Sequence, residues 1–236
     1  MTEELFREDA YLRQCECTVT HVDDAGIRLD RTVFYPQGGG QPGDQGVLEL
    51  SGGGEVRIID TRKGSDPGEI VHLPAHPSAD LLPGARVQVR IDWGRRHRHM
   101  RMHTCLHLLG ALVDAPVTGG SVAADKGRLD FDLPEPTVSK EHLSLELNRL
   151  VSENHRVSGR WISDREMATQ PELVRTMAVK PPTGGGRVRL LDIEGVDLQP
   201  CGGTHVAATG EIGPVRIAKI EKKSRHNRRV VVVFDD

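Results

Sequence analysis

The segment that begins Met102-His103-Thr104-Cys105-Leu106-His107 divides this 236-residue chain into two parts with different sequence patterns. Apolar residues recur in this segment at intervals of three and four, which is typical of an amphipathic helix. They are Met102, Leu106, Leu109 and Val113. The helical pattern runs from Trp93 through Ala115, whereas the residues before Trp93 show the pattern of strands. We therefore expect two domains, one at residues 1–93 and one at residues 94–236.

The first domain has the sequence pattern of an all-β protein. Short runs rich in Val, Ile, Leu and Thr are separated by Gly, Pro and Asp turns. The runs that we expect as strands are 15–22, 47–50, 56–60 and 87–91. Ser51-Gly52-Gly53-Gly54 separates two of these runs, and glycine tolerates the positive φ angles that a hairpin connection needs. The sequence therefore predicts a small N-terminal β-barrel.

The second domain mixes helices with strands. An amphipathic helix is predicted at 139–154, with Ser139 able to cap its start. Ser163 and Glu166 have the spacing of a capping box for a third, short helix that ends before Pro171. Strands are predicted at 129–133, 187–193, 215–220 and 230–234. The expected fold class of the chain is therefore α+β.

Composition narrows the class of protein. Hydrophobic residues make up 37% and charged residues 28%, which is typical of a globular protein. The net charge of -3 gives no uniformly basic surface, so any RNA contact must come from local clusters. The first 14 residues lack the apolar core of a secretory signal, and no apolar run is long enough to cross a membrane. Four cysteines in such a chain predict reduced thiols and a cytoplasmic location.

Two short segments carry the residue types that bind zinc. His103 and His107 lie four residues apart, which places both imidazoles on one face of the expected helix. Far downstream, Cys201 and His205 border a turn that contains two glycines. Each pair alone has an ordinary explanation, either a chance histidine pair or a buried thiol in a glycine turn. Together, three nitrogens and one sulfur predict a tetrahedral site for one Zn²⁺ per chain.

The remaining cysteines and two nearby histidines have simpler interpretations. Cys105 lies about half a turn round the helix from the two histidines, so we expect it to pack in the core. Cys15 and Cys17 share one face of a predicted strand, where they either bind a metal or fill the barrel, and we favour filling. His97 and His99 are interpreted as surface residues or partners of the ligands, not as ligands themselves.

The motifs, taken as a set, resemble the editing domain of alanyl-tRNA synthetase and its free-standing relatives, the AlaX proteins. The resemblance lies in His103-Thr104-x-x-His107-Leu108-Leu109 and in Gln199-Pro200-Cys201-Gly202-Gly203-Thr204-His205. The segment from Phe34 to Asp44 is similar to the glycine-rich motif of the longer AlaX forms. Threonyl-tRNA synthetase editing domains share a related histidine and cysteine arrangement without this stretch. The resemblance implies that the second domain has the fold common to both editing domains.

The resemblance also implies an activity. The reaction would be hydrolysis of the ester that joins a wrong amino acid to tRNA(Ala), namely serine or alternatively glycine, with alanine spared. The implied catalytic residues are the four metal ligands His103, His107, Cys201 and His205, together with Thr104. Zinc could polarise the ester carbonyl or activate a water molecule. Four protein ligands would close the site, so either one of them, such as Cys201, is displaced, or zinc mainly organises the substrate.

Candidate substrate contacts fall into two groups. The backbone of Gly38, Gly39, Gly40 and Gln41 could approach the acceptor end, although the same residues also fit a tight barrel turn. Thr118, Thr104 and Gln41 are candidates for a hydrogen bond to the serine hydroxyl. Basic residues near the metal helix and near the chain end would neutralise phosphates. Those expected to contact tRNA are Arg96, Arg101, Arg228 and Arg229.

Two other functions remain open at this point. A closed zinc site also fits a non-catalytic RNA-binding module whose metal is structural. A threonyl-type editing enzyme for another aminoacyl-tRNA is the second alternative. The expected partner is RNA in each case and not a membrane, and the sequence leaves monomer and homodimer equally open.

Overall fold

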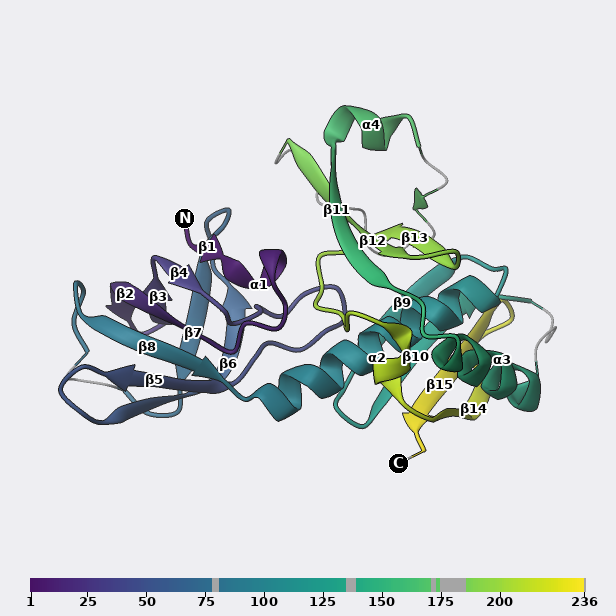
Figure 1. The fold of residues 1–236 in the computed structure, drawn as a ribbon, viewed down its shortest axis with the longest axis horizontal. Coiled ribbons are helices and arrows are strands. Elements are labelled where there is room, and N and C mark those ends of the chain that lie inside the picture. Colours follow the sequence, from purple (N-terminus) through teal and green to yellow (C-terminus); the bar gives the residue numbers. More distant parts are fainter. Residues whose placement is uncertain (78–80, 135–138, 171–172, 175–185, 236) are drawn as a thin grey trace. The chain divides into compact units, whose positions relative to one another are not determined.

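The chain folds into two compact units. The structure, a computed structural model, describes residues 1–77, 81–134, 139–170, 173–174 and 186–235. The units are Met1–His97 and Arg98–Asp236 (Figure 1). The longest helix, α2 (Trp93–Leu112), runs through this division. The domain boundary expected after Trp93 therefore falls at the start of a continuous helix, and it stays a prediction. No described helix combines the length and apolar character that a membrane crossing requires.

The first unit is built on a closed barrel of six strands, which confirms the predicted small barrel. The strands follow one another in the order β2, β3, β7, β6, β5, β8, and β8 pairs with β2 to close the ring. They are β2 (Gln14–Asp23), β3 (Gly26–Leu29), β5 (Gly46–Leu50), β6 (Glu55–Lys63), β7 (Ile70–Pro74) and β8 (Arg86–Ile91). The short elements β1 (Glu3–Glu4), α1 (Leu5–Glu8) and β4 (Arg31–Thr32) lie outside the ring. The sequence does not predict β3 or β7, which are too short to show a clear alternation.

Alternating side chains of the strands fill the barrel. Along β8, Val87, Val89 and Ile91 are buried while the residues between them are more exposed, because successive side chains of a strand point to opposite faces. Cys17 is part of the same apolar cluster, and Cys15 packs against it. The interpretation of this cysteine pair as barrel filling is therefore confirmed.

The glycine-rich segment forms a tight turn. The amide of Gly38 donates to the carbonyl of Gln41 at 3.1 Å, and the amide of Gln41 donates back at 2.9 Å. The two residues between them, Gly39 and Gly40, have φ angles of 57° and 82°, a left-handed conformation that glycine adopts without steric cost. The Tyr35 hydroxyl donates to the Gly38 carbonyl at 2.9 Å. The backbone thus forms the tight turn that was one of the two interpretations of this segment.

A buried ion pair holds the end of the glycine-rich segment. The side chains of Arg96 and Asp44 are 0% and 1% exposed. The Arg96 guanidinium donates to both Asp44 oxygens and also to the carbonyls of Ala10 and Val33. The expectation that Arg96 contacts a tRNA phosphate is therefore wrong. Removing its carboxylate partner would leave an uncompensated buried charge, which is strongly destabilising.

His72 of β7 is a fully buried, neutral imidazole. Its Nδ1 is 3.1 Å from the Ile27 carbonyl oxygen, and its Nε2 is 2.9 Å from the Thr32 hydroxyl. Because a carbonyl oxygen can only accept, Nδ1 carries the ring proton and Nε2 accepts from Thr32. Burial lowers the pKa of His72 from 6.5 to about 4. The histidine therefore stays uncharged in the folded barrel at neutral pH.

We expect the barrel to lose stability as the pH falls from 7 to 5. The unfolded chain takes up a proton at His72 below pH 6.5, whereas the folded barrel does so only near pH 4. Protonation therefore favours the unfolded chain, by about 2 kcal/mol over this pH interval. Urea unfolding followed by circular dichroism, compared between wild type and His72→Gln, measures this contribution. His21→Gln, at an exposed position of β2, is the matched control. An identical pH dependence in wild type and His72→Gln would contradict the expectation.

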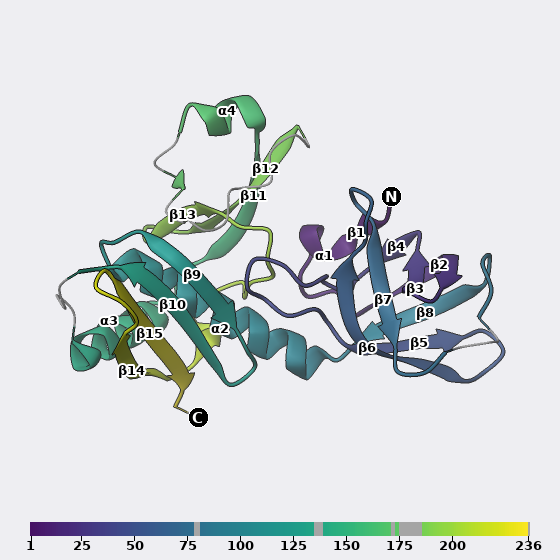
Figure 2. The ribbon, with the colours of Figure 1, turned by 180° about the vertical axis from the view of Figure 1, so that it is seen from behind.

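The second unit contains two antiparallel sheets (Figure 2). Strands follow the order β14, β15, β10, β9 in one sheet and β11, β12, β13 in the other. They are β9 (Val117–Val122), β10 (Lys126–Asp132), β11 (Val157–Ser163), β12 (Arg187–Ile193), β13 (Asp197–Pro200), β14 (Val215–Lys222) and β15 (Asn227–Phe234). The four strands predicted in this part of the chain correspond to β10, β12, β14 and β15. The sequence does not predict β9, β11 or β13, whose glycine and polar residues have low intrinsic strand preference.

Helix ends in the second unit follow the predicted capping residues. The Ser139 hydroxyl accepts from the amide of His142 at 3.1 Å and begins α3 (Lys140–Ser152). Ser163 and Glu166 form the predicted capping box of α4 (Asp164–Ala168). Helix α2 ends at Leu112, three residues before the predicted end. A short 3₁₀ helix, η2 (Thr209–Ile212), follows the residues of the candidate metal centre described below.

A glycine lets α2 approach the four-stranded sheet closely. A β-carbon at Gly127 of β10 would lie 2.7 Å from the sulfur of Met102 and 3.1 Å from Leu106. Such distances are shorter than van der Waals contact, so a larger residue there would force the side chain of Met102 to move. Met102 and Leu106 therefore face the sheet. Since they neighbour His103 and His107 along the helix, this packing sets which way the helix face that carries the two imidazoles is turned.

Candidate metal centre

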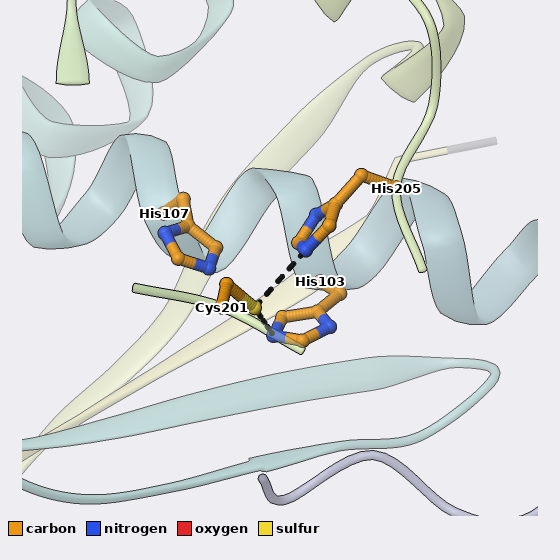
Figure 3. A group of neighbouring side chains, drawn as sticks. All are labelled: His103, His107, Cys201 and His205. Atoms are coloured by element: carbon orange, nitrogen blue, oxygen red, sulfur yellow. Dashed lines mark hydrogen bonds between the residues drawn. The ribbon is translucent and has the colours of Figure 1, made fainter. Parts of the chain in front are cut away.

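Four side chains from two distant parts of the second unit come together. His103 and His107 project from α2, while Cys201 and His205 lie on the turn that follows β13 (Figure 3). Their ligand atoms all lie within 4.8 Å of one another. The structure thus brings together the two pairs identified in the sequence, as one group that could hold a single metal ion.

The spacing of the donor atoms fits a tetrahedral ion. The Cys201 sulfur lies 3.2 Å from His205 Nε2 and 3.7 Å from His103 Nε2. A zinc ion with bonds of about 2.0–2.3 Å separates its tetrahedral ligands by about 3.3–3.8 Å. These two separations are close to that range, and the 4.8 Å limit on the others means that binding of an ion would draw the donors together by up to about 1 Å. The donor set and its dimensions are therefore compatible with zinc.

The electrostatics of the group favour a thiolate among imidazoles. Burial by itself raises the pKa of Cys201, but the charges of His103, His205 and His107 outweigh it and hold that pKa well below the usual range. Burial lowers the pKa of His205 to about 3. Burial also opposes the charge on His107, but Cys201 and Asp197 raise its pKa to about 9. The anionic sulfur and the neutral His205 are in the forms that bind metal ions, whereas His107 would have to give up a proton to become a ligand.

The turn that carries Cys201 is held by an arginine from β12. Arg189 donates from one guanidinium nitrogen to the carbonyls of Cys201 and Gly203, at 3.1 Å each. The amide of Gly203 lies 3.4 Å from the Cys201 sulfur and donates to it. A β-carbon at Gly159 would come within 2.9 Å of the Arg189 guanidinium, so glycine makes room for it. The sequence does not identify Arg189, because its carbonyl partners become visible only once the turn is folded.

Two buried polar residues contact the imidazoles from outside the donor group. The Thr104 hydroxyl lies 3.2 Å from Nδ1 of His205, and an Asp197 oxygen lies 3.6 Å from Nδ1 of His107. Thr104 is 0% exposed, and its hydroxyl also donates to the Met100 carbonyl. A hydroxyl engaged in this way does not fit the expected direct contact with the substrate. The sequence does not identify Asp197, whose neighbours give no motif.

Thr118 also uses its hydroxyl within the protein. Its hydroxyl oxygen donates to the Asp130 carbonyl at 3.1 Å and accepts from the Asn227 amide at 2.6 Å. Arg229 forms two hydrogen bonds to the Asp130 carboxylate, at 2.7 and 2.9 Å. Thr118 and Arg229 are nevertheless partly accessible. Their roles as substrate contacts stay predictions.

Two further arginines expected at the tRNA are engaged by the protein itself. Arg228 is 7% exposed and donates to the carbonyls of Pro134 and Ser224. Its burial contradicts the expected phosphate contact. Arg101 donates to the Ile212 carbonyl at 2.8 Å, and its guanidinium lies 4.2 Å from the centre of the Phe234 ring. Because Arg101 is only half-buried, its expected contact with phosphate stays a prediction.

The remaining candidates lie at identifiable places in their own units. Gln41 is fully buried in the first unit, at the end of the glycine turn, and the substrate role of that turn stays a prediction. Cys105 is fully buried, and burial raises the pKa of its thiol to about 12, which confirms the packing role. His97 stacks on Trp93 with ring centres 5.3 Å apart. His99 is fully buried, so it is not a surface residue, and the alternative that it is a partner of the ligands stays a prediction.

Comparison with protein families places both units in the aminoacyl-tRNA synthetase context. The model of the threonyl and alanyl tRNA synthetase second additional domain matches residues 188–231, which include Cys201 and His205. The model of class II (A) tRNA synthetases matches residues 8–95, which include the whole barrel. Two separate segments of the chain are therefore similar to two different synthetase family models.

The chain is also similar, over nearly its whole length, to alanyl-tRNA editing proteins and to part of an alanine–tRNA ligase. The chain is 38% identical over 246 residues to the alanyl-tRNA editing protein AlaX-M of Methanosarcina acetivorans, covering 100% of both chains. It is 31% identical to the AlaX-M protein of Saccharolobus solfataricus, covering 98% of both chains. It is also 36% identical to an alanine–tRNA ligase of Pyrococcus abyssi, where 98% of this chain matches 25% of the ligase. The chain belongs to the AlaX family of alanyl-tRNA editing proteins.

Proposed function

We propose that this chain is an aminoacyl-tRNA deacylase that removes serine, or alternatively glycine, from mischarged tRNA(Ala) and spares alanine. The observation that carries the proposal is the convergence of His103, His107, Cys201 and His205 within 4.8 Å. The convergence occurs in a chain 38% identical to an alanyl-tRNA editing protein. The family match supplies the class of substrate, and the donor group supplies a means of hydrolysing an ester.

The chemistry of the donor set supports zinc as the resident ion. Imidazole nitrogen and thiolate sulfur are the donors that zinc prefers, whereas magnesium and calcium prefer oxygen. A bound zinc ion supplies Lewis acidity toward an ester carbonyl or a water molecule near neutral pH. The chain contributes the four donors and, through Arg189, a fixed turn for two of them.

Access of substrate requires one donor to give way, because four protein ligands leave no open position on zinc. We propose Cys201 as that donor. The neighbours Thr104 and Asp197 contact the rings of His205 and His107, and restrict them. Arg189 holds the backbone of Cys201, and the sulfur accepts a long hydrogen bond from the Gly203 amide at 3.4 Å, so rotation about the Cα–Cβ bond can move the sulfur while the turn stays in place.

Release of serine from Ser-tRNA(Ala) tests the proposed function. Purified full-length chain should release serine well above the uncatalysed rate, lose the activity after dialysis against a chelator, and regain it when Zn²⁺ is restored. Serine wrongly charged on tRNA(Thr) serves as the competing substrate and tests the threonyl-type alternative. Serine release no faster than background, with zinc present, would reject the proposal.

A further inference from the structure

The hydrogen bonds of Thr104 determine which nitrogen of His205 carries the proton. The Thr104 oxygen lies 2.9 Å from the Met100 carbonyl oxygen, 3.3 Å from the Val206 amide nitrogen and 3.2 Å from His205 Nδ1. The carbonyl can only accept, so the single hydroxyl proton points to Met100. The oxygen must then accept from both Val206 and His205. It follows that His205 Nδ1 carries a proton and that the Nε2 lone pair, 3.2 Å from the Cys201 sulfur, faces the donor group.

His107 has a comparable partner of a different chemical kind. Its Nδ1 lies 3.6 Å from an oxygen of Asp197, whose side chain is 1% exposed. A carboxylate only accepts, so it favours the proton on Nδ1 and leaves Nε2 free for a metal. The Gln199 amide donates to the same Asp197 oxygen at 2.7 Å, which holds the carboxylate in place. Two of the three imidazoles therefore have an acceptor on the nitrogen that points away from the donor group.

We infer that Thr104 and Asp197 are positioning residues of the metal centre, which fix the ring orientation and the proton of His205 and His107 so that both bind through Nε2. This inference rests on the metal site of the proposed function, but it does not depend on the identity of the ester substrate. It assigns Thr104 a role through His205 in place of the direct catalytic or serine-binding role expected from the sequence. A partner of this kind typically changes metal affinity by about 10- to 100-fold when it is removed.

Zinc affinity of matched variants tests the inference. Thr104→Val keeps the shape of the side chain but removes the acceptor, and we expect it to weaken zinc binding by about 10- to 100-fold in competition with a chromogenic chelator. Thr104→Ser restores the hydroxyl and should bind within about threefold of wild type. Asp197→Asn should also weaken binding. Asp192→Asn, at an exposed carboxylate of β12, is its control and should bind as wild type does. Wild-type affinity in both Thr104→Val and Asp197→Asn would overturn the inference.

A measurement on the unaltered protein covers the case in which the variants fold poorly. Long-range ¹H–¹⁵N correlation spectra of the zinc-loaded wild type distinguish Nδ1-protonated from Nε2-protonated histidine. We expect His205 and His107 to bind through Nε2 and to carry the proton on Nδ1, and coordination of either ring through Nδ1 overturns the inference. If the wild type binds no zinc at all, the metal centre itself is rejected and this inference with it. Normal zinc binding without ester hydrolysis rejects only the proposed function.

Discussion

Replacing His103 by alanine is expected to abolish deacylation while the protein stays folded. The change removes one of four donors whose atoms lie within 4.8 Å. Loss of an outer partner of a metal ligand already costs about 10- to 100-fold in activity, so loss of the ligand itself should cost more than about 100-fold. Single-turnover release of serine from Ser-tRNA(Ala) measures the effect, with circular dichroism and urea unfolding as measures of folding.

The same variant separates an enzyme from an RNA-binding module with a structural metal. A structural zinc site contributes its binding free energy to folding, so its loss would unfold the second unit. An editing enzyme would keep its four-stranded sheet, because α3 packs on β14 and Met102 and Leu106 of α2 pack on β10 whether or not a metal is bound. His142→Ala, at an exposed position of α3, is the matched control and should leave both activity and folding unchanged. Full activity in His103→Ala would reject the proposed catalytic role of the metal centre, and an unfolded variant would favour the structural alternative.

Serine is expected to leave tRNA(Ala) about 10⁴ to 10⁵ times faster than alanine, each as an ester on the same tRNA. A synthetase pocket cannot fully exclude serine, which merely adds a hydroxyl to alanine, so a second site has to recognise that hydroxyl. A site with a buried polar group that bonds to the hydroxyl leaves this group unpaired when alanine enters, which is costly. Single-turnover rates for the two charged tRNAs give the ratio directly.

Hydrolysis of Gly-tRNA(Ala) distinguishes a site that recognises the serine hydroxyl from a site that selects its substrate by size. A site that recognises the hydroxyl should hydrolyse glycine as slowly as alanine, whereas a site that excludes by size should hydrolyse glycine faster than alanine. Thr118→Val tests whether the Thr118 hydroxyl forms a hydrogen bond to the serine hydroxyl. Because its oxygen already bonds to Asp130 and Asn227, a fall in the serine rate alone would mean that the substrate displaces one of these partners. Comparable rates for serine and alanine would contradict the proposed selectivity.

The local features of this protein could be predicted from the sequence. A spacing of four on a helix places His103 and His107 on one face whatever surrounds the helix. The caps at Ser139 and Ser163 depend on hydrogen bonds within three residues, and both are found. The alternation of Val87, Val89 and Ile91 specifies a strand with one buried face. Each of these features depends on neighbours in the chain, and so the sequence contains the information.

The fate of the polar side chains was decided only by the tertiary structure. The sequence predicts that Arg96 binds a phosphate, yet Arg96 pairs with Asp44, which lies 52 residues away. The sequence predicts that Thr104 is a catalytic residue, yet its hydroxyl contacts Nδ1 of His205, which lies 101 residues further along the chain. Asp197 and Arg189 acquire their roles from α2 and from a folded turn. The sequence by itself determined the two donor pairs, the strands with clear alternation and the caps, because short-range spacing defines them. Which polar groups face the metal centre, the core or solvent was decided by long-range packing, because a hydrogen bond exists only when distant segments supply its partner.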